Sequence, residues 1–143
     1  MIMGYPIIAA ALVLAATSIA SAEMRGEHFV KNWDLDGDGK VTAAEALERR
    51  ATIFLTFDAN EDAFLDADEY KVFDEARAND MADRPHRGQR MRAAANGMRL
   101  EANDRDGDGR VSRGEFLAQA DAWIIAMDRN GDEVISVEDF RAE

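Results

Sequence analysis

An acidic pattern of twelve residues occurs twice in nearly identical form, at residues 34–45 and 104–115, and it constrains this chain more than any other feature. Each copy has aspartate at positions 1, 3 and 5, glycine at position 6, a hydroxyl side chain at position 9 and glutamate at position 12. A hard dication takes about six to eight oxygen ligands, which these side chains and the carbonyl at position 7 can supply. The glycine permits the positive φ angle that folds a loop around an ion. The pattern therefore predicts two calcium-binding loops.

We name these copies loop 1 and loop 3, and in each the residue at position 7 is a ligand through its backbone carbonyl. The predicted ligands of loop 1 are Asp34, Asp36, Asp38, Lys40, Thr42 and Glu45. The predicted ligands of loop 3 are Asp104, Asp106, Asp108, Arg110, Ser112 and Glu115. Position 8 of both loops is valine, which suits a short β-bridge to a neighbouring loop.

A weaker copy of the pattern starts 24 residues after the start of loop 1. The ligand positions of this loop 2, residues 58–69, hold Asp58, Asn60, Asp62, Phe64, Asp66 and Glu69. Position 6 is Ala63 instead of glycine. An L-residue at positive φ costs on the order of 1 kcal/mol, so we expect loop 2 to bind calcium more weakly.

A second weak copy, loop 4, occupies residues 128–139 and departs further from the pattern. Its ligand positions hold Asp128, Asn130, Asp132, Val134, Ser136 and Asp139. Glu133 replaces the glycine, and Asp139 is one methylene shorter than the usual glutamate. Contact through one oxygen or through water would suit the smaller magnesium ion. The other interpretation is a loop that holds no ion and braces loop 3, with Ile135 against Val111.

The second half of the chain repeats the first with an offset of 70 residues, and 12 residues separate the two loops within each half. This separation fits either two short helices with a bend or one continuous helix of roughly 20 Å. Apolar residues recur at helical spacing beside the loops, which predicts a hydrophobic core, with a partner-binding groove as the alternative. They are Phe29, Val30, Trp33, Leu47, Ile53, Phe54, Phe57, Tyr70, Phe73, Leu100, Phe116, Leu117, Trp123, Ile124, Met127 and Phe140.

The charge balance excludes several classes of function. The net charge is −12, and 15 of the 29 acidic residues lie at ligand positions of the four loops. This acidity argues against nucleic-acid binding, which needs positive charge. There is no cysteine, which excludes disulfides and thiolate metal sites. After residue 22 the only serines are Ser112 and Ser136, and no glycine-rich phosphate loop or histidine metal pair occurs, so we expect no enzymatic activity.

The N-terminal segment is typical of an export signal. Residues 1–22 carry no charged side chain, and an apolar stretch from Ile7 to Ala16 precedes the small residues Ala20, Ser21 and Ala22. This pattern predicts cleavage after Ala22 and a periplasmic or secreted chain without a membrane span. The segment lacks the usual lysine or arginine near its start. An uncleaved membrane anchor and a buried helix are the two alternatives.

The stretch between the two repeats has a different composition. Residues 74–99 contain six arginines, namely Arg77, Arg84, Arg87, Arg90, Arg92 and Arg99. Pro85 and Gly88 should interrupt any helix there. A solvated basic linker is one interpretation. A docking site for an acidic partner or an anionic lipid surface is the other.

Over residues 25–143 the loops resemble those of the EF-hand superfamily. The resemblance implies an all-α fold in which two EF-hand pairs, with short β-bridges between paired loops, are joined by a basic linker. It implies an N-terminal pair at 23–73, a linker at 74–99 and a C-terminal pair at 100–143. The short spacing and the export signal are similar to those of small exported bacterial proteins, including the lanmodulin family of lanthanide binders. Position 2 departs from that family, because Leu35, Ala59, Arg105 and Arg129 replace proline, and only loop 2 has aspartate at position 9.

Together these features predict a non-enzymatic, exported protein whose cofactor is Ca²⁺. It would act as a calcium-dependent structural or interaction module, or as a calcium sensor or buffer. Affinity separates the two, because extracellular modules bind at about 10⁻⁴–10⁻³ M and sensors at about 10⁻⁷–10⁻⁵ M. A periplasmic metal scavenger with lanthanide preference is the alternative. A protein partner would bind an apolar face exposed by the metal, or the arginine-rich segment.

Overall fold

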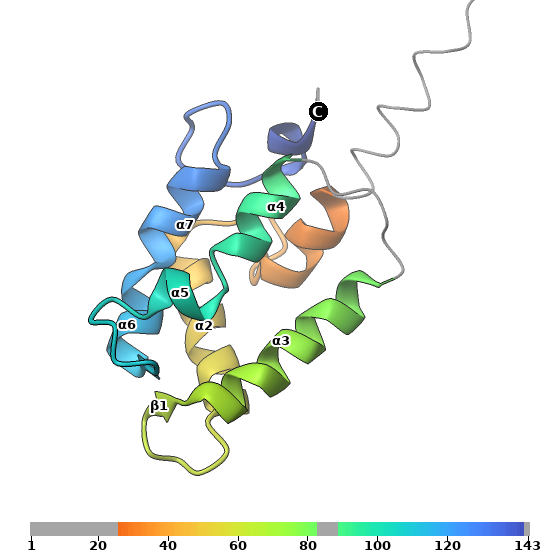
Figure 1. Cartoon of the computed structure of the whole chain (residues 1–143). Helices are drawn as coiled ribbons and strands as arrows, with labels where there is room; N and C mark the ends of the chain where they lie inside the picture. The colour runs from red at the N-terminus through yellow and green to blue at the C-terminus, as the bar shows by residue number, and fades with distance from the viewer. Residues whose placement is uncertain (1–25, 83–88, 142–143) are drawn as a thin grey trace, which may run out of the picture.

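The computed structural model describes residues 26–82 and 89–141, and it has the all-α class that the sequence predicts. A helix at residues 26–33 precedes loop 1 (Figure 1). The remaining elements are α2 (Ala43–Phe57), β1 (Phe64–Leu65), α3 (Ala67–Met81), α4 (Gln89–Asn96), α5 (Leu100–Asn103), β2 (Val111–Ser112), α6 (Arg113–Ala118), α7 (Ala120–Met127) and the 3-10 helix η1 (Val137–Phe140). None of the described helices is long and apolar enough to cross a membrane. The predicted signal and the expected helix break at Pro85 and Gly88 lie outside the described residues.

The segment between loops 1 and 2 is one continuous helix. Helix α2 has 15 residues, which corresponds to about 22 Å at about 1.5 Å per residue. Thr42 starts it with a capping box, in which its side chain accepts a hydrogen bond from the N–H of Glu45. In the second half, α6 and α7 meet at Gln119 and span the distance between loops 3 and 4. Loops 1 and 2 therefore lie at opposite ends of α2, too far apart to pair.

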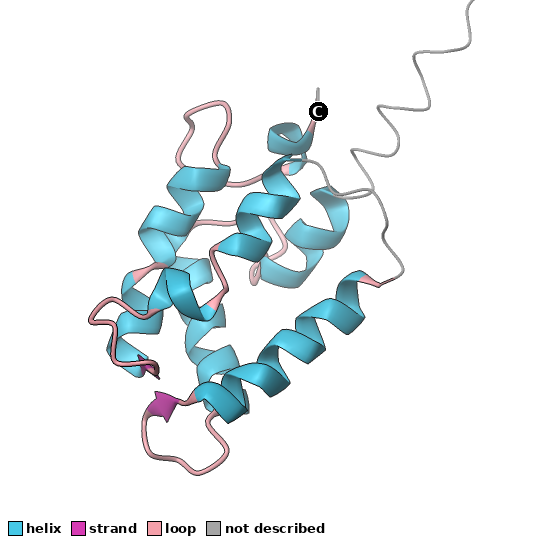
Figure 2. Cartoon of the chain, in the orientation of Figure 1, coloured by secondary structure: helices cyan, strands magenta, loops and turns pink. Residues whose placement is uncertain are grey.

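Each loop instead pairs with a loop of the other half. Strand β1 of loop 2 lies antiparallel to β2 of loop 3, with Leu65 opposite Val111 (Figure 2). Loop 1 contacts loop 4 through a bridge in which the N–H groups of Val41 and Ile135 each donate to the other's carbonyl, at 2.8 and 2.9 Å. The expected contact of Ile135 with Val111 is therefore wrong. The two pairs exist, but they are loop 1 with loop 4 and loop 2 with loop 3.

The two halves share a single hydrophobic core. Helix α2 packs on both α6 and α7, and the ring centroids of Phe54 and Phe116 are 5.9 Å apart. Phe29 lies 5.6 Å from Trp123 by the same measure. Most of the predicted core residues are buried. The prediction for Leu47 is wrong, since this residue of α2 is 44% exposed. The predicted domain boundaries at residues 73 and 100 thus do not separate two cores.

The described part of the predicted linker belongs to the fold. Helix α3 extends to Met81, and α4 places Ala94 in the core. Arg77 donates to the carbonyl of Ala95 at 2.9 Å, and Arg90 donates to the carbonyl of Ala126 at 3.2 Å. These two arginines therefore hold helices together. Arg84, His86 and Arg87 lie outside the described residues.

A buried arginine joins the helices at the centre of the core. Arg50 of α2 is fully buried, and its Nη1 donates to the side-chain oxygen of Asn103 at 3.0 Å and to the carbonyl of Phe116 at 2.9 Å. Its Nη2 donates to the carbonyl of Gly97 at 3.2 Å. Asn103 donates in turn to the hydroxyl of Tyr70 at 3.2 Å. Burial lowers the pKa of Arg50 to about 10, which still leaves it charged at neutral pH.

We expect Gly97→Ala to destabilise the protein by about 1–3 kcal/mol, because overpacking forces the surrounding core to shift. A Cβ at Gly97 would overlap the ring of Trp123, which is 4% exposed and donates to the carbonyl of Ala94 at 3.0 Å. Urea unfolding followed by tryptophan fluorescence measures the change. Gly114→Ala is the control, since its Cβ would have only Ser112 Oγ nearby, at 4.0 Å. Equal stability of the two variants would contradict this packing.

Candidate metal centre

The four loops share one pattern of hydrogen bonds, although two of them depart from the sequence motif. In each loop the N–H of position 6 donates to the carboxylate at position 1. These bonds join Gly39 to Asp34 (2.8 Å), Ala63 to Asp58 (3.0 Å), Gly109 to Asp104 (3.0 Å) and Glu133 to Asp128 (2.8 Å). The N–H of position 7 donates likewise to the carboxylate at position 5. These bonds join Lys40 to Asp38, Phe64 to Asp62, Arg110 to Asp108 and Val134 to Asp132.

The carboxylate at position 12 closes each loop by accepting the N–H of position 2. The bonds are Leu35 to Glu45 (3.0 Å), Ala59 to Glu69 (2.9 Å), Arg105 to Glu115 (3.0 Å) and Arg129 to Asp139 (2.7 Å). Asp139 therefore reaches the same partner as the longer glutamates, and it is fully buried within η1. Loop 4 thus has the same closed conformation as the other three.

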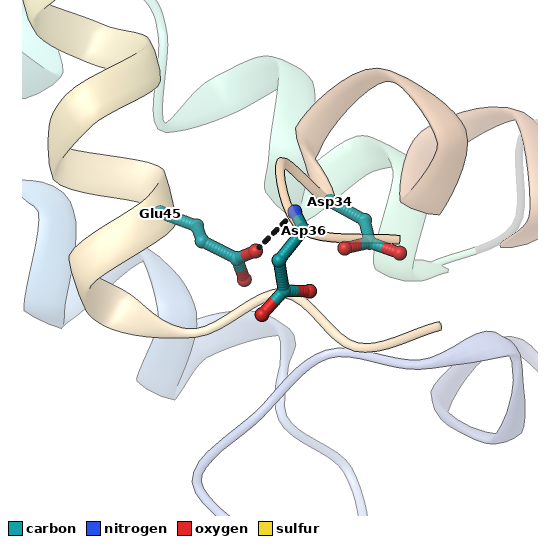
Figure 3. Close-up of side chains that lie close together, drawn as sticks. All are labelled: Asp34, Asp36 and Glu45. Atoms are coloured by element: carbon teal, nitrogen blue, oxygen red, sulfur yellow. Dashed lines mark hydrogen bonds between the residues drawn. The ribbon is translucent and has the colours of Figure 1, made fainter. Parts of the chain in front are cut away.

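Acidic side chains converge in every loop. Three carboxylates of each loop place oxygens within 4.8 Å of one another. The groups are Asp34, Asp36 and Glu45; Asp58, Asp62 and Glu69; Asp104, Asp106 and Asp108; and Asp128, Asp132 and Asp139. Figure 3 shows the first group, in which Glu45 comes from α2, the two aspartates come from loop 1, and the N–H of Asp36 donates to Glu45. Twelve of the predicted ligands are thus brought together.

The other predicted ligands have different roles in the structure. Asp38 and Glu115 are outside these groups, and one oxygen of Glu115 accepts from the hydroxyl of Ser112 at 3.2 Å. Asn60 and Asn130 accept the N–H groups of position 5, at 3.2 and 3.1 Å. At position 7 the predicted ligand is the backbone carbonyl, and the N–H group of the same residue is held by the carboxylate at position 5.

The position 9 side chains are helix caps, a role that the metal motif alone does not reveal. Thr42, Asp66, Ser112 and Ser136 are the N-caps of the helices that follow the loops. The reciprocal capping box with position 12 is complete in loops 1, 2 and 4. A hydroxyl residue or aspartate three positions before an acid is the sequence signature of this box, so the signal was present.

Like charges crowd the loops. The hydrogen bond from the N–H of Asp38 lowers the pKa of Asp36. Burial and the nearby carboxylates of Asp34, Asp38 and Glu45 raise it by more, so the net pKa of Asp36 is raised. The pKa of Asp106 is raised in the same way. In contrast, burial alone would raise the pKa of Asp34, but N–H donors from Gly39 and Gly37 lower it. A bound cation would relieve this crowding.

Loop 2 carries more backbone strain than its sequence motif indicates. Ala63 has φ of 66°, as the motif predicts, and Glu133 has φ of 67° at the same position of loop 4. Glu61 also has a positive φ, 56°, at position 4, where the other loops have Gly37, Gly107 and Gly131. The motif names no glycine at position 4, so this second strained residue was missed.

The comparison with protein families agrees with this geometry. Residues 100–118 match the family model described as EF hand. The match covers α5, loop 3 and α6, and with the acidic groups it supports a relationship to the EF-hand superfamily and a calcium-binding module. No curated protein and no solved structure matches the chain.

An apolar cavity lies among the helix at residues 26–33, α2, α3 and α4. Its volume is about 310 Å³. About half of the residues that line it are aromatic residues and methionines, namely Phe29, Trp33, Phe57, Phe73, Trp123, Met81, Met91 and Met98. Arg49 also lines it. Residues from Phe73 to Met81 of helix α3, which starts in loop 2, form one wall of the cavity.

We expect Ala63→Gly to tighten metal binding at loop 2 by roughly fivefold, because it removes about 1 kcal/mol of strain at positive φ. Site-resolved calcium titration by NMR measures the change. Ala59→Gly is the matched control in the same loop, since Ala59 is exposed and does not have a positive φ. A weaker site in Ala63→Gly would show that this backbone conformation is not the one that binds metal.

Metal affinity should fall as the pH is lowered. We expect the fall to begin at a higher pH than it would if the ligands were ordinary aspartates, whose pKa is 3.8. Asp36 and Asp106 have raised pKa values, and each must lose its proton before it can bind a cation. Titrations between about pH 7 and about pH 4.5 test this. Asp36→Asn combined with Asp106→Asn should bind more weakly at neutral pH but with a flatter pH profile. The exposed Asp121→Asn is the control, and a double variant with the wild-type profile would contradict the assignment.

Proposed function

We propose that this chain is an exported calcium-binding protein with four EF-hand loops and no catalytic role. The observation that carries the proposal is the common hydrogen-bond frame of the four loops, in which positions 1, 5 and 12 are held in place by backbone N–H groups. Within each frame three carboxylates converge to within 4.8 Å. Convergent anionic oxygens on a short loop are the donor set that hard dications prefer.

The residues that would hold the ion are the predicted ligands of each loop, and a bound Ca²⁺ would supply positive charge to these carboxylates. Loops 1 and 3 have glycine at both positive-φ positions, so we propose that they bind most tightly. Loop 2 has two strained residues and loop 4 has one, so both should be weaker. The buried carboxylate of Asp139 favours loop 4 as a real site, with magnesium as the alternative occupant.

Two roles fit such a protein, a calcium-dependent structural or interaction module and a calcium sensor or buffer. For either role we propose a periplasmic or secreted location after cleavage at Ala22. The apolar cavity supports a protein partner that contributes an apolar side chain, since methionines and aromatic rings adapt to varied apolar surfaces. The exposed Arg92 and Arg99 support a second contact with an acidic partner.

Calorimetric calcium titration of the chelator-stripped chain from residue 23, with magnesium at about 1 mM, tests the proposal. Filling of two to four sites near micromolar calcium would indicate a sensor or buffer, and filling near millimolar would indicate a structural module. A parallel titration with lanthanum tests the alternative of a lanthanide scavenger. The absence of binding heat with either metal would overturn the metal-binding function.

Glu45→Gln and Glu115→Gln should each weaken one site by about tenfold or more, because each removes a charged oxygen from position 12. The same calorimetry measures the loss. Glu48→Gln is the control, since Glu48 is exposed on α2 outside the loops. Calcium affinity that is unchanged in both position 12 variants would refute the assignment of loops 1 and 3.

A further inference from the structure

Three members of the buried network around Arg50 are direct sequence neighbours of predicted metal ligands. Tyr70 follows Glu69, which closes loop 2. Asn103 precedes Asp104, the first ligand position of loop 3, and Phe116 follows Glu115, its last. A shift of one of these ligands therefore moves the backbone of a network residue directly.

The network connects the helices at the base of loops 2 and 3. Arg50 bonds the side chain of Asn103 on α5 and the carbonyl of Phe116 on α6, at 3.0 and 2.9 Å. Asn103 bonds the hydroxyl of Tyr70 on α3 at 3.2 Å, and this hydroxyl donates to the carbonyl of Met98. The helix that leaves loop 2 is thus tied to the helices that enter and leave loop 3.

Loops 2 and 3 are consequently held together at two separate places. At their tips, β1 and β2 pair through Leu65 and Val111. At their bases, the polar network joins α3, α5 and α6. Loop 1 has no such network at its base among the described residues, although α2, which follows it, supplies Arg50.

The chemistry of Arg50 indicates more than core filling. It is fully buried, none of its hydrogen bonds goes to a carboxylate, and its Nε has no hydrogen-bond partner among the described residues. The rings of Phe116 and Trp123 lie 5.0 Å from its guanidinium. A well-packed apolar side chain would avoid the desolvation of a buried charge. The planar guanidinium group of Arg50 instead fixes the geometry between the carbonyls of Gly97 and Phe116 and the side chain of Asn103.

We propose that Arg50, Asn103 and Tyr70 are positioning residues that couple metal binding at loop 2 to metal binding at loop 3. The inference rests on the proposed calcium-binding function and goes beyond it. Filling one loop orders Glu69 or Glu115 and, through the adjacent network residue, the base of the other loop. The second loop then has less conformational freedom to lose when it binds, which gives positive cooperativity.

A double-mutant cycle measures this coupling. Glu69→Gln weakens loop 2, and its effect on loop 3 is followed by calcium titration of the Gly109 amide resonance. In the wild-type background we expect it to weaken loop 3 by roughly fivefold or more, the usual range of allosteric coupling. In Tyr70→Phe and in Arg50→Met this factor should fall at least twofold, because only the β1–β2 pairing then joins the two loops fully. By reciprocity, Glu115→Gln should weaken loop 2, read at Ala63, by the same factor.

A control variant, a milder network variant and an internal reference keep the result specific. Arg49→Met changes the adjacent arginine of α2, which forms no hydrogen bond or ion pair in the described structure, and it should retain the full coupling factor. Tyr70→Phe removes only a hydroxyl group, so it tests the network even if Arg50→Met fails to fold. Gly39 in loop 1 is the internal reference, and its titration should change little in Tyr70→Phe.

Each outcome decides between the two claims. A wild-type coupling factor that persists in Tyr70→Phe, with calcium binding intact, would overturn this inference and leave the proposed function standing. No calcium binding in the wild-type chain would overturn both. Coupling that is reduced in Tyr70→Phe and kept in Arg49→Met would support the positioning role.

Discussion

Helix α2 holds loops 1 and 2 about 22 Å apart, because it runs without a break through the 12 residues between them. Neither loop can therefore reach the other, and each bonds to a loop from the second half, at opposite ends of the same helix. The remaining architecture follows from this separation. Helices α6 and α7 must lie along α2 to bring loops 3 and 4 to its two ends, and the apolar faces of both halves then merge into one core.

The shared core needs a polar centre because several helices end inside it. The turn before α5 and the last turn of α6 bring backbone carbonyls of Gly97 and Phe116 into the interior, where an unbonded carbonyl is costly. Arg50 satisfies both, and its neighbours Asn103 and Tyr70 satisfy one another. The arginine is charged without a carboxylate partner, so its hydrogen bonds and the two aromatic rings beside it are what compensate for its burial.

The loops use the same carboxylates for two purposes. Position 12 accepts N–H groups of the loop and of the helix N-cap, and position 1 accepts the N–H of position 6, so the carboxylates that would hold an ion also fix the loop backbone. This arrangement gathers negative charges that repel one another, and with desolvation this repulsion raises the pKa of Asp36. A cation would relieve this repulsion, whereas a neutral ligand would not.

The sequence by itself determined the loops, because their chemistry is local: spacing alone identified the clustered acids, the strained Ala63 and the helices beside each loop. It also contained the capping signature at positions 9 and 12, which the metal motif obscured. Motif reasoning could not show that Asp139 of loop 4 reaches the same N–H group as a glutamate. The tertiary structure alone decided which loops pair, why Leu47 is exposed and why Arg50 is buried. These features depend on the packing of segments some 50 to 90 residues apart, and residue spacing carries no information about such contacts.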